Sequence, residues 1–329
     1  MNKNNQNIGR LLLVLLLFIT FSAFAAAQER HTVDRPLPIA ALPVVPFVEE
    51  TPVQHAPIRW ETDFERAKSI AKTSSRQLLI YLYADGNQEM PEAMADIPII
   101  PASQKFNTDV LDDQSVRSGL DGYVLLKLPM DAKTTNEEGI KCSIYSLPGF
   151  EHMLEHPGLV VIDFAHRDMP YYGEVVGILP FLQGQSPTAE QTAVFLNLPP
   201  GTLTQRTLTY AVRIHPDQPQ SANGTPAPIV VQMATEHAEF QAERGVLGHH
   251  NYSLRVYQAK EILGGGSPAE ICAQSRPGLG LFEGAIACMR LWRNSPAHWS
   301  IARSSHTYFG YDMAQGGNGA WYAVGFFIN

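Results

Sequence analysis

The hydrophobic positions of the chain first recur at helical spacing, three and four residues apart, in the stretch FERAKSIAKTSSR at residues 64–76. A nearly continuous apolar and aromatic run, QLLIYLYAD, follows at residues 77–85 and is typical of a buried strand. Residues 106–120 predict a turn and a helix, and residues 122–131 and 156–164 predict two further strands. This order of helices and strands predicts an α/β domain.

The stretch LTQRTLTYAVRI, residues 203–214, alternates apolar and polar positions and therefore predicts a strand. Its flanks are rich in proline and glycine, which is typical of a connection between domains. We place the domain boundary near Pro200, or as late as His215. The chain is thus expected to hold one domain at residues 57–200 and a second at residues 201–329.

The last third of the chain predicts two helices and a hairpin. An amphipathic helix starts at Pro228 and stops at Gly245, a residue that suits the C-terminal end of a helix. His237 falls on the apolar stripe of this helix, so we expect a structural role for it. Residues 281–292 predict another helix, and residues 307–327 predict two strands joined by a Gly-Asn turn.

The first 27 residues have the pattern of a secretory signal peptide. Two basic residues precede an apolar run at residues 11–27, which ends in small side chains. We expect cleavage after Ala27 and export to the periplasm or the cell exterior; the alternative is an uncleaved membrane anchor. Residues 28–56 are rich in proline, lack periodicity and predict an extended linker.

Composition narrows the classes of function. The 329 residues carry a formal net charge of −8, which argues against a nucleic-acid-binding protein. No later segment is apolar and long enough to span a bilayer once the signal peptide is removed. Export would make the three cysteines relevant. Either Cys272 and Cys288 form a disulfide and Cys142 is left over, or all three are small buried thiols.

Residues 57–200 resemble a thioredoxin-like domain. The resemblance rests on the run LLIYLYADGNQEM, a following helix and strand, and HPGLVVID. In that family a CxxC pair follows the first strand, and those two positions here hold Asn87 and Met90. The family's cis-proline corresponds to Pro157. Since Asn and Met cannot form thiolates, and Cys142 lies far along the chain, the resemblance implies a scaffold without dithiol exchange.

Residues 215–329 resemble the CAP superfamily of cysteine-rich secretory, antigen and pathogenesis-related proteins, also called SCP. Four elements appear in order: A…HA…GH, AEICAQS, WRNSPAHW and GYDM…NGAWYAVGFF. The third is similar to the bacterial motif W-x-x-S-P-G-H, with Ala297 in place of glycine. The resemblance implies an α-β-α sandwich. The phrase GTLTQRTLTYAVRIHP and the pairing of the two domains also resemble exported bacterial proteins of planctomycete type.

The CAP resemblance implies a cavity with two histidines and two acidic residues. His298 matches the second histidine, and His249 matches the first, with His250 as the alternative. Glu270 matches the first acid. The position of the second acid holds Ser295, so the tetrad is incomplete. Glu283 lies on the preceding helix, more than two turns earlier, and is not expected to replace it.

Two imidazoles and a carboxylate are suited to zinc, with an open position for water. The same three groups could instead form a buried polar network without a metal. In either case we expect Ser295 to cap a new helical turn with Pro296 at its first position, which would fix the frame that carries His298.

Three classes of function follow. The first, implied by the CAP resemblance and favoured by the incomplete tetrad, is a non-catalytic module that binds a lipid, glycan or protein ligand. The second is a zinc-assisted hydrolase or peptidase in which Glu270 is the base and His249 and His298 are ligands. The third is a structural interaction protein of the cell envelope.

Overall fold

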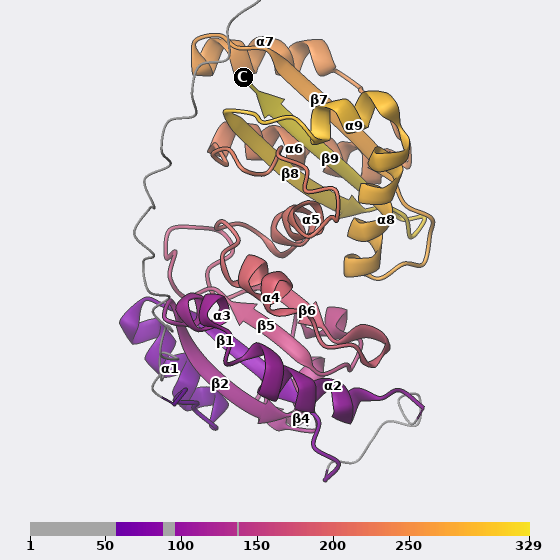
Figure 1. Cartoon of the computed structure of the whole chain (residues 1–329). Helices are drawn as coiled ribbons and strands as arrows, with labels where there is room; N and C mark the ends of the chain where they lie inside the picture. The colour runs from indigo at the N-terminus through magenta and orange to yellow at the C-terminus, as the bar shows by residue number, and fades with distance from the viewer. Residues whose placement is uncertain (1–56, 88–95, 137) are drawn as a thin grey trace, which may run out of the picture. The chain divides into compact units, whose positions relative to one another are not determined.

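The structure, a computed structural model, describes residues 57–87, 96–136 and 138–329. The expected signal peptide, the proline-rich segment and Met90 lie outside the described residues. The described chain is a mixed α/β fold with a four-strand mixed sheet and a three-strand antiparallel sheet, each packed against helices (Figure 1).

The four-strand sheet has the order β2-β1-β5-β6. Strands β1 (Gln77–Tyr83) and β2 (Tyr123–Pro129) are parallel, and their first residues pair with each other. Strand β5 (Gly158–Ile162) is antiparallel to β1, and β6 (Val175–Pro180) is antiparallel to β5. The three strands predicted from apolar runs are therefore confirmed. Strand β6 was not anticipated from the sequence.

Both faces of this sheet are covered. Leu78 and Ile80 share one buried cluster with Ala67 of the first helix, whereas Leu79 and Tyr81 belong to a cluster on the opposite face. The helical segments of this half are α1 (Phe64–Ser74), α2 (Ile99–Lys105), a π-helical turn η2 (Phe106–Val110), α3 (Gln114–Leu120) and α4 (Ala189–Leu196). Small elements complete it: β3 (Lys133–Thr135), β4 (Lys141–Ser143), η3 (Ile144–Ser146), η4 (Phe150–Met153) and η5 (Leu182–Gly184).

The second sheet has the order β7-β9-β8, and both pairs are antiparallel. Its strands are β7 (Pro268–Gln274), β8 (Tyr308–Gln315) and β9 (Trp321–Ile328). The predicted hairpin is confirmed as β8 and β9. Strand β9 follows both of its neighbours in the sequence and yet lies between them.

Helices cover both faces of the second sheet. Cys272 and Phe326 share a buried cluster with Met233 of α6 (Pro228–Arg244), while Ile271 shares another with residues of α8 (Leu281–Asn294). Two further helices, α7 (Tyr252–Leu263) and α9 (Pro296–Ala302), contact β7. Helix α6 ends where predicted, because Gly245 adopts the left-handed conformation at φ +65°.

The alternating stretch at residues 203–214 is not a strand; it forms helix α5 (Leu203–Arg213). Thr202 and Gln205 form a capping box, in which each side chain binds the backbone N–H of the other residue. The helix packs against β6 on one side and against β8 and α8 on others, so every residue from 206 to 212 is buried. Leu208, Ala211 and Val212 recur at helical spacing and belong to one buried cluster, so the sequence carries a helical period beside the apparent alternation.

The cysteines are separate thiols in the structure. Cys272 and Cys288 are buried, and Cys142 on β4 is only partly buried, which departs from the expectation of three buried thiols. Within the described ranges, no helix combines the length and apolar character needed to cross a membrane.

Candidate functional site

Glu270 is the centre of the candidate site. It stands on β7, on the face of the sheet that α6 covers, and its side chain is 1% exposed. One oxygen, Oε1, lies 2.8 Å from Nδ1 of His249. The other, Oε2, accepts hydrogen bonds from Arg255 Nε at 2.9 Å and Nη2 at 2.5 Å. Both oxygens of the carboxylate are therefore engaged, and its charge is balanced by a guanidinium.

His249 is placed by the loop between α6 and α7. The backbone N–H of Gly248 donates to Gln241 Oε1 at 3.0 Å, and the Gly248 carbonyl lies 2.8 Å from Nε2 of His237. Arg255 Nη1 donates to the carbonyl oxygen of His250 at 2.6 Å. Three side chains thus fix the loop on both sides of His249, whose own side chain remains 47% exposed.

The alternative histidine, His250, does not contact the carboxylate. Its ring lies against Phe240, with centroids 5.6 Å apart, and against His237 at 6.3 Å. Its Nε2 atom is buried and has no hydrogen-bond partner among the described residues. Of the two candidates, the structure brings His249 to Glu270.

His298 faces His249. Their ring centroids are 6.1 Å apart, and the ring planes are inclined by 31°. Burial lowers the pKa of His298, and the neighbouring His249 lowers it further, so the imidazole is neutral at neutral pH. Ser295 is the N-cap residue of α9 and Pro296 occupies its first turn, as predicted, but the Ser295 side chain makes no capping hydrogen bond. The frame of His298 therefore depends on the proline and on packing.

Packing around the two flanking tryptophans supplies that frame. Trp292, at the end of α8, is completely buried, and Trp299 on α9 is 9% exposed. The Trp299 ring lies 5.2 Å from the ring of His215 and is covered by the Arg293 guanidinium at 5.0 Å. The two indoles hold α8 and α9 in place, and His298 lies between them in sequence on this fixed turn.

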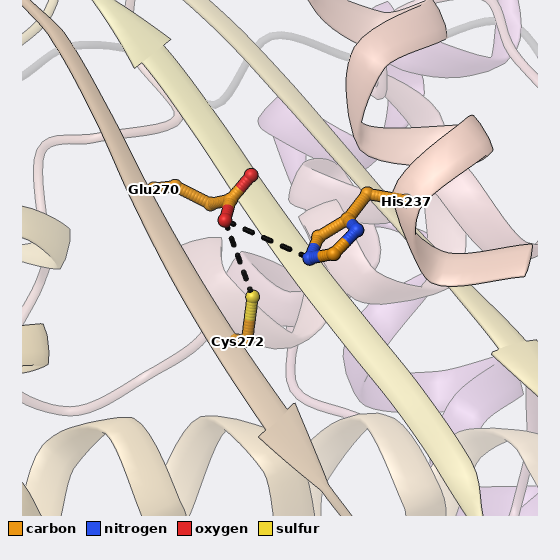
Figure 2. A group of neighbouring side chains, drawn as sticks. All are labelled: His237, Glu270 and Cys272. Atoms are coloured by element: carbon orange, nitrogen blue, oxygen red, sulfur yellow. Dashed lines mark hydrogen bonds and ion pairs between the residues drawn. The ribbon is translucent and has the colours of Figure 1, made fainter. Parts of the chain in front are cut away.

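Two more polar side chains reach Glu270 from positions that the sequence analysis did not assign to the site. Figure 2 shows His237 approaching from α6 and Cys272 standing beside Glu270 on β7. The His237 Nε2 atom and the Cys272 Sγ atom lie 3.6 Å and 3.7 Å from Glu270 Oε1. These three residues could each direct one ligand atom at a metal ion, with all three atoms within 4.8 Å of one another.

The protonation of these neighbours opposes metal binding. Burial lowers the pKa of His237, and its Nε2 must carry a proton to donate to the Gly248 carbonyl, so that nitrogen has no free lone pair. Burial raises the pKa of the Cys272 thiol far above its usual range, which keeps the thiol protonated. The positive charge of Arg255 also disfavours a second cation next to Glu270.

The remaining predicted residues lie elsewhere. Glu283 is exposed in the first turn of α8, and Ser295 carries no acidic group, so no second carboxylate joins the described site. In the first half, Asn87 lies beyond the end of β1, and its backbone N–H donates to Asp85 at 2.9 Å. The expectation of a cis-proline at Pro157 is wrong, because the described chain contains no cis peptide bond.

Comparison of the sequence with models of known protein families gave no match. No curated protein is similar to the chain at a significant level.

Proposed function

We propose that the protein is an exported, non-catalytic binding protein that joins a thioredoxin-like domain without dithiol chemistry to a CAP-like domain. The observation that carries the proposal is the state of Glu270. Both oxygens of its carboxylate are already bound, by Arg255 and by His249. A general base needs a free oxygen aimed at a water molecule or a substrate. A carboxylate bound in this way is suited to fixing the orientation of His249.

The arrangement of both sheets supports the proposed families. The order β2-β1-β5-β6, with one parallel and two antiparallel pairs, agrees with a thioredoxin-like core. The sheet β7-β9-β8, with α6 and α8 on opposite faces, agrees with the α-β-α sandwich implied by the CAP resemblance.

The surface beside His249 supports a ligand with apolar character, such as a lipid or a protein. Val246 and Leu247 directly precede Gly248 and are 48% and 44% exposed. Helix α7, which follows, leaves Leu254, Tyr257 and Ile262 between 57% and 65% exposed. Exposed apolar side chains concentrated on one loop and the next helix are typical of interaction surfaces.

One observation favours the alternative, a zinc-assisted hydrolase. His249 and His298 face each other, and the lowered pKa of His298 leaves it in the neutral form that metals require. The donor set nevertheless fits zinc poorly, since the carboxylate that would complete it is paired with Arg255. A metal at this position would have to displace that guanidinium.

Zinc titration of the purified protein separates the two functions. We expect the wild type to bind less than one equivalent of zinc, and a His249→Ala, His298→Ala double variant to behave identically. His152→Ala, which removes a histidine far from the site in sequence, is the control. If the wild type binds one equivalent of zinc and only the double variant loses it, the binding proposal is wrong and the hydrolase is the better proposal.

A further inference from the structure

The first half of the protein contains a cavity of about 410 Å³ that is separate from the Glu270 site. It lies at the edge of the four-strand sheet where β1 and β2 begin, lined by Gln77 and Tyr123, the first residues of those strands. This is the edge opposite to the end of β1, beyond which Asn87 lies. The volume lies within the range of pockets that hold small ligands.

Arg206 is one of the residues that line this cavity, and none of the described carboxylates forms an ion pair with its guanidinium. The residue is 2% exposed, and its Nη1 donates to the carbonyl oxygens of Leu198 and Pro199 at 3.1 Å and 2.9 Å. Its Nε and Nη2 atoms are buried and lack a hydrogen bond of good geometry within the part of the chain that the structure describes. These two atoms form the edge of a guanidinium that binds a carboxylate or phosphate through two parallel hydrogen bonds.

No carboxylate of the described residues is bound to that edge. The nearest group is the hydroxyl of Tyr123, which interacts with the guanidinium and donates its own proton to the carbonyl oxygen of Leu196 at 2.8 Å; a neutral hydroxyl leaves the charge of Arg206 without a counter-ion. Asp163 is fully buried and also attracts the guanidinium, yet its oxygens are bound by Gln77 at 3.0 Å and by His166. A buried charge without a directly bound partner is costly, so a counter-ion at this edge would be strongly favoured.

The rest of the cavity wall is also suited to an anion. Arg76 and His166 both line it, and among the described lining residues none is acidic, although the whole chain is negatively charged. Nδ1 of His166 lies 2.7 Å from Asp163 Oδ1, and this contact orients the imidazole ring. Two arginines and an oriented histidine therefore surround a space that excludes carboxylates of the protein itself.

We propose that this cavity is a binding site for an anionic ligand whose carboxylate or phosphate group pairs with the Nε and Nη2 atoms of Arg206. The ligand class is a small oxyanion-bearing molecule. The anionic group could belong to a carboxylic acid, including a peptide C-terminus, or to a phosphorylated metabolite. The site is independent of Glu270 and does not rest on the function proposed above.

The test uses the purified protein and follows the Nε–H resonance of Arg206 by NMR, assigned by its loss in Arg206→Lys. Sodium phosphate and sodium acetate are added separately, with sodium chloride at matched ionic strength as the reference. We expect a saturable shift of this resonance with phosphate, acetate or both, and none with chloride. A response to phosphate alone would show that the site binds a phosphate group. A response to acetate would show that it binds a carboxylate group.

Calorimetry with the same salts then measures affinity in matched variants. Arg206→Lys keeps the charge but loses the two-atom edge, so we expect affinity to fall about tenfold or more. Arg213→Lys is the control, because Arg213 lies on the same helix and also binds two carbonyl oxygens but does not line the cavity. Equal affinity in wild type and Arg206→Lys, or an Nε–H shift that follows ionic strength with every salt, would overturn the proposal.

If Arg206→Lys fails to fold, His166→Gln replaces it in the affinity measurement. The glutamine can still bind Asp163 but removes the imidazole from the cavity wall, so we expect a several-fold loss of affinity beside a normal circular-dichroism spectrum. Unchanged affinity in His166→Gln, together with no saturable shift in the wild type, would again contradict an anion site.

Discussion

Glu270 and Arg255 meet inside the protein with side chains that are 1% and 9% exposed. A buried ion pair contributes little net stability compared with apolar residues, but breaking it by removing one partner leaves an uncompensated charge. The pair therefore acts as a constraint: it ties α7 to β7 and sets the orientation of the carboxylate that His249 contacts.

We expect Arg255→Met to lower the free energy of unfolding by about 3–5 kcal/mol, because it leaves the buried Glu270 carboxylate without its positively charged partner. Urea denaturation at neutral pH measures this loss. The double variant Arg255→Met, Glu270→Gln should recover much of the loss, since no buried charge remains. A double variant as unstable as the single one would show that the loss comes from packing and not from the charge.

Asp312 on β8 is a buried carboxyl that is held by neutral hydrogen-bond donors. It accepts hydrogen bonds from Thr235 Oγ1 at 2.6 Å, from Gln205 Nε2 at 3.1 Å and from the backbone N–H of Met313 at 2.8 Å. Burial nevertheless raises its pKa above the ordinary value, against the opposing effect of these hydrogen bonds. The raised pKa means that this residue favours the folded state only while it is protonated.

Its contribution to stability is therefore present below the unfolded pKa and is lost as pH rises through the folded pKa. We expect Asp312→Asn to gain stability relative to the wild type as pH rises from about 4 upward. Denaturation curves across this range give the difference. Glu65→Gln, which removes an exposed carboxylate on α1, is the control and should show no comparable trend. A pH-independent difference for Asp312→Asn would contradict the assignment.

Sequence reasoning at the residue scale reached part of the site. The motif positions of His249, Glu270 and His298 are close in the structure. His237 was placed correctly on the buried stripe of α6, but a stripe does not reveal which polar group lies opposite it. Arg255 was missed for the same reason, since its role depends on a tertiary contact with β7.

At the scale of elements, apolar runs predicted the buried strands well and helix α5 badly. Strand β1 is buried along most of its length, so its sequence is continuously apolar. Helix α5 is also buried on all sides, and its Thr-rich sequence then mimics strand alternation. Helix α7 escaped notice because part of its apolar surface faces solvent. The signal that was available for α5 was the capping box of Thr202 and Gln205.

Thr202→Ala should therefore destabilise the protein by about 1 kcal/mol or more, because it uncaps α5. Gln205 also donates to Thr235 and Asp312, so a frayed first turn weakens that network as well. Thr188→Ala, which removes the equivalent capping box of α4, is the matched comparison and should cost less. Thermal and urea denaturation measure both. A smaller loss for Thr202→Ala than for Thr188→Ala would contradict the central position given to α5.

For the described chain as a whole, α5 is the element that both sheets share. Its Tyr210 ring packs against the rings of Phe195 of α4 and Phe282 of α8, with centroids 6.0 Å and 5.8 Å away. The expected boundary near Pro200 falls just before this helix, which packs against β6 of the first half as well as against β8. Neither half can lose α5 without exposing part of its core.

We accordingly expect a single cooperative unfolding transition. Trp60→Phe would leave three tryptophans, Trp292, Trp299 and Trp321, all in the second half. The urea transition of their fluorescence should coincide with that of the far-ultraviolet circular dichroism, which reports on both halves. Two separated transitions would show that the halves unfold independently despite α5.

The position of β9 has a consequence for the timing of folding during synthesis. Strands β7 and β8 are not hydrogen-bonded to each other, since each pairs only with β9, which the ribosome makes after both. Until β9 has been translated, neither strand has its partner, and the apolar faces of α6 and α8 have no complete sheet to cover. A premature stop before Trp321 would thus remove the partner of both strands and not merely one edge of the sheet. The second half is a structure that the chain can complete only after β9 has been synthesised.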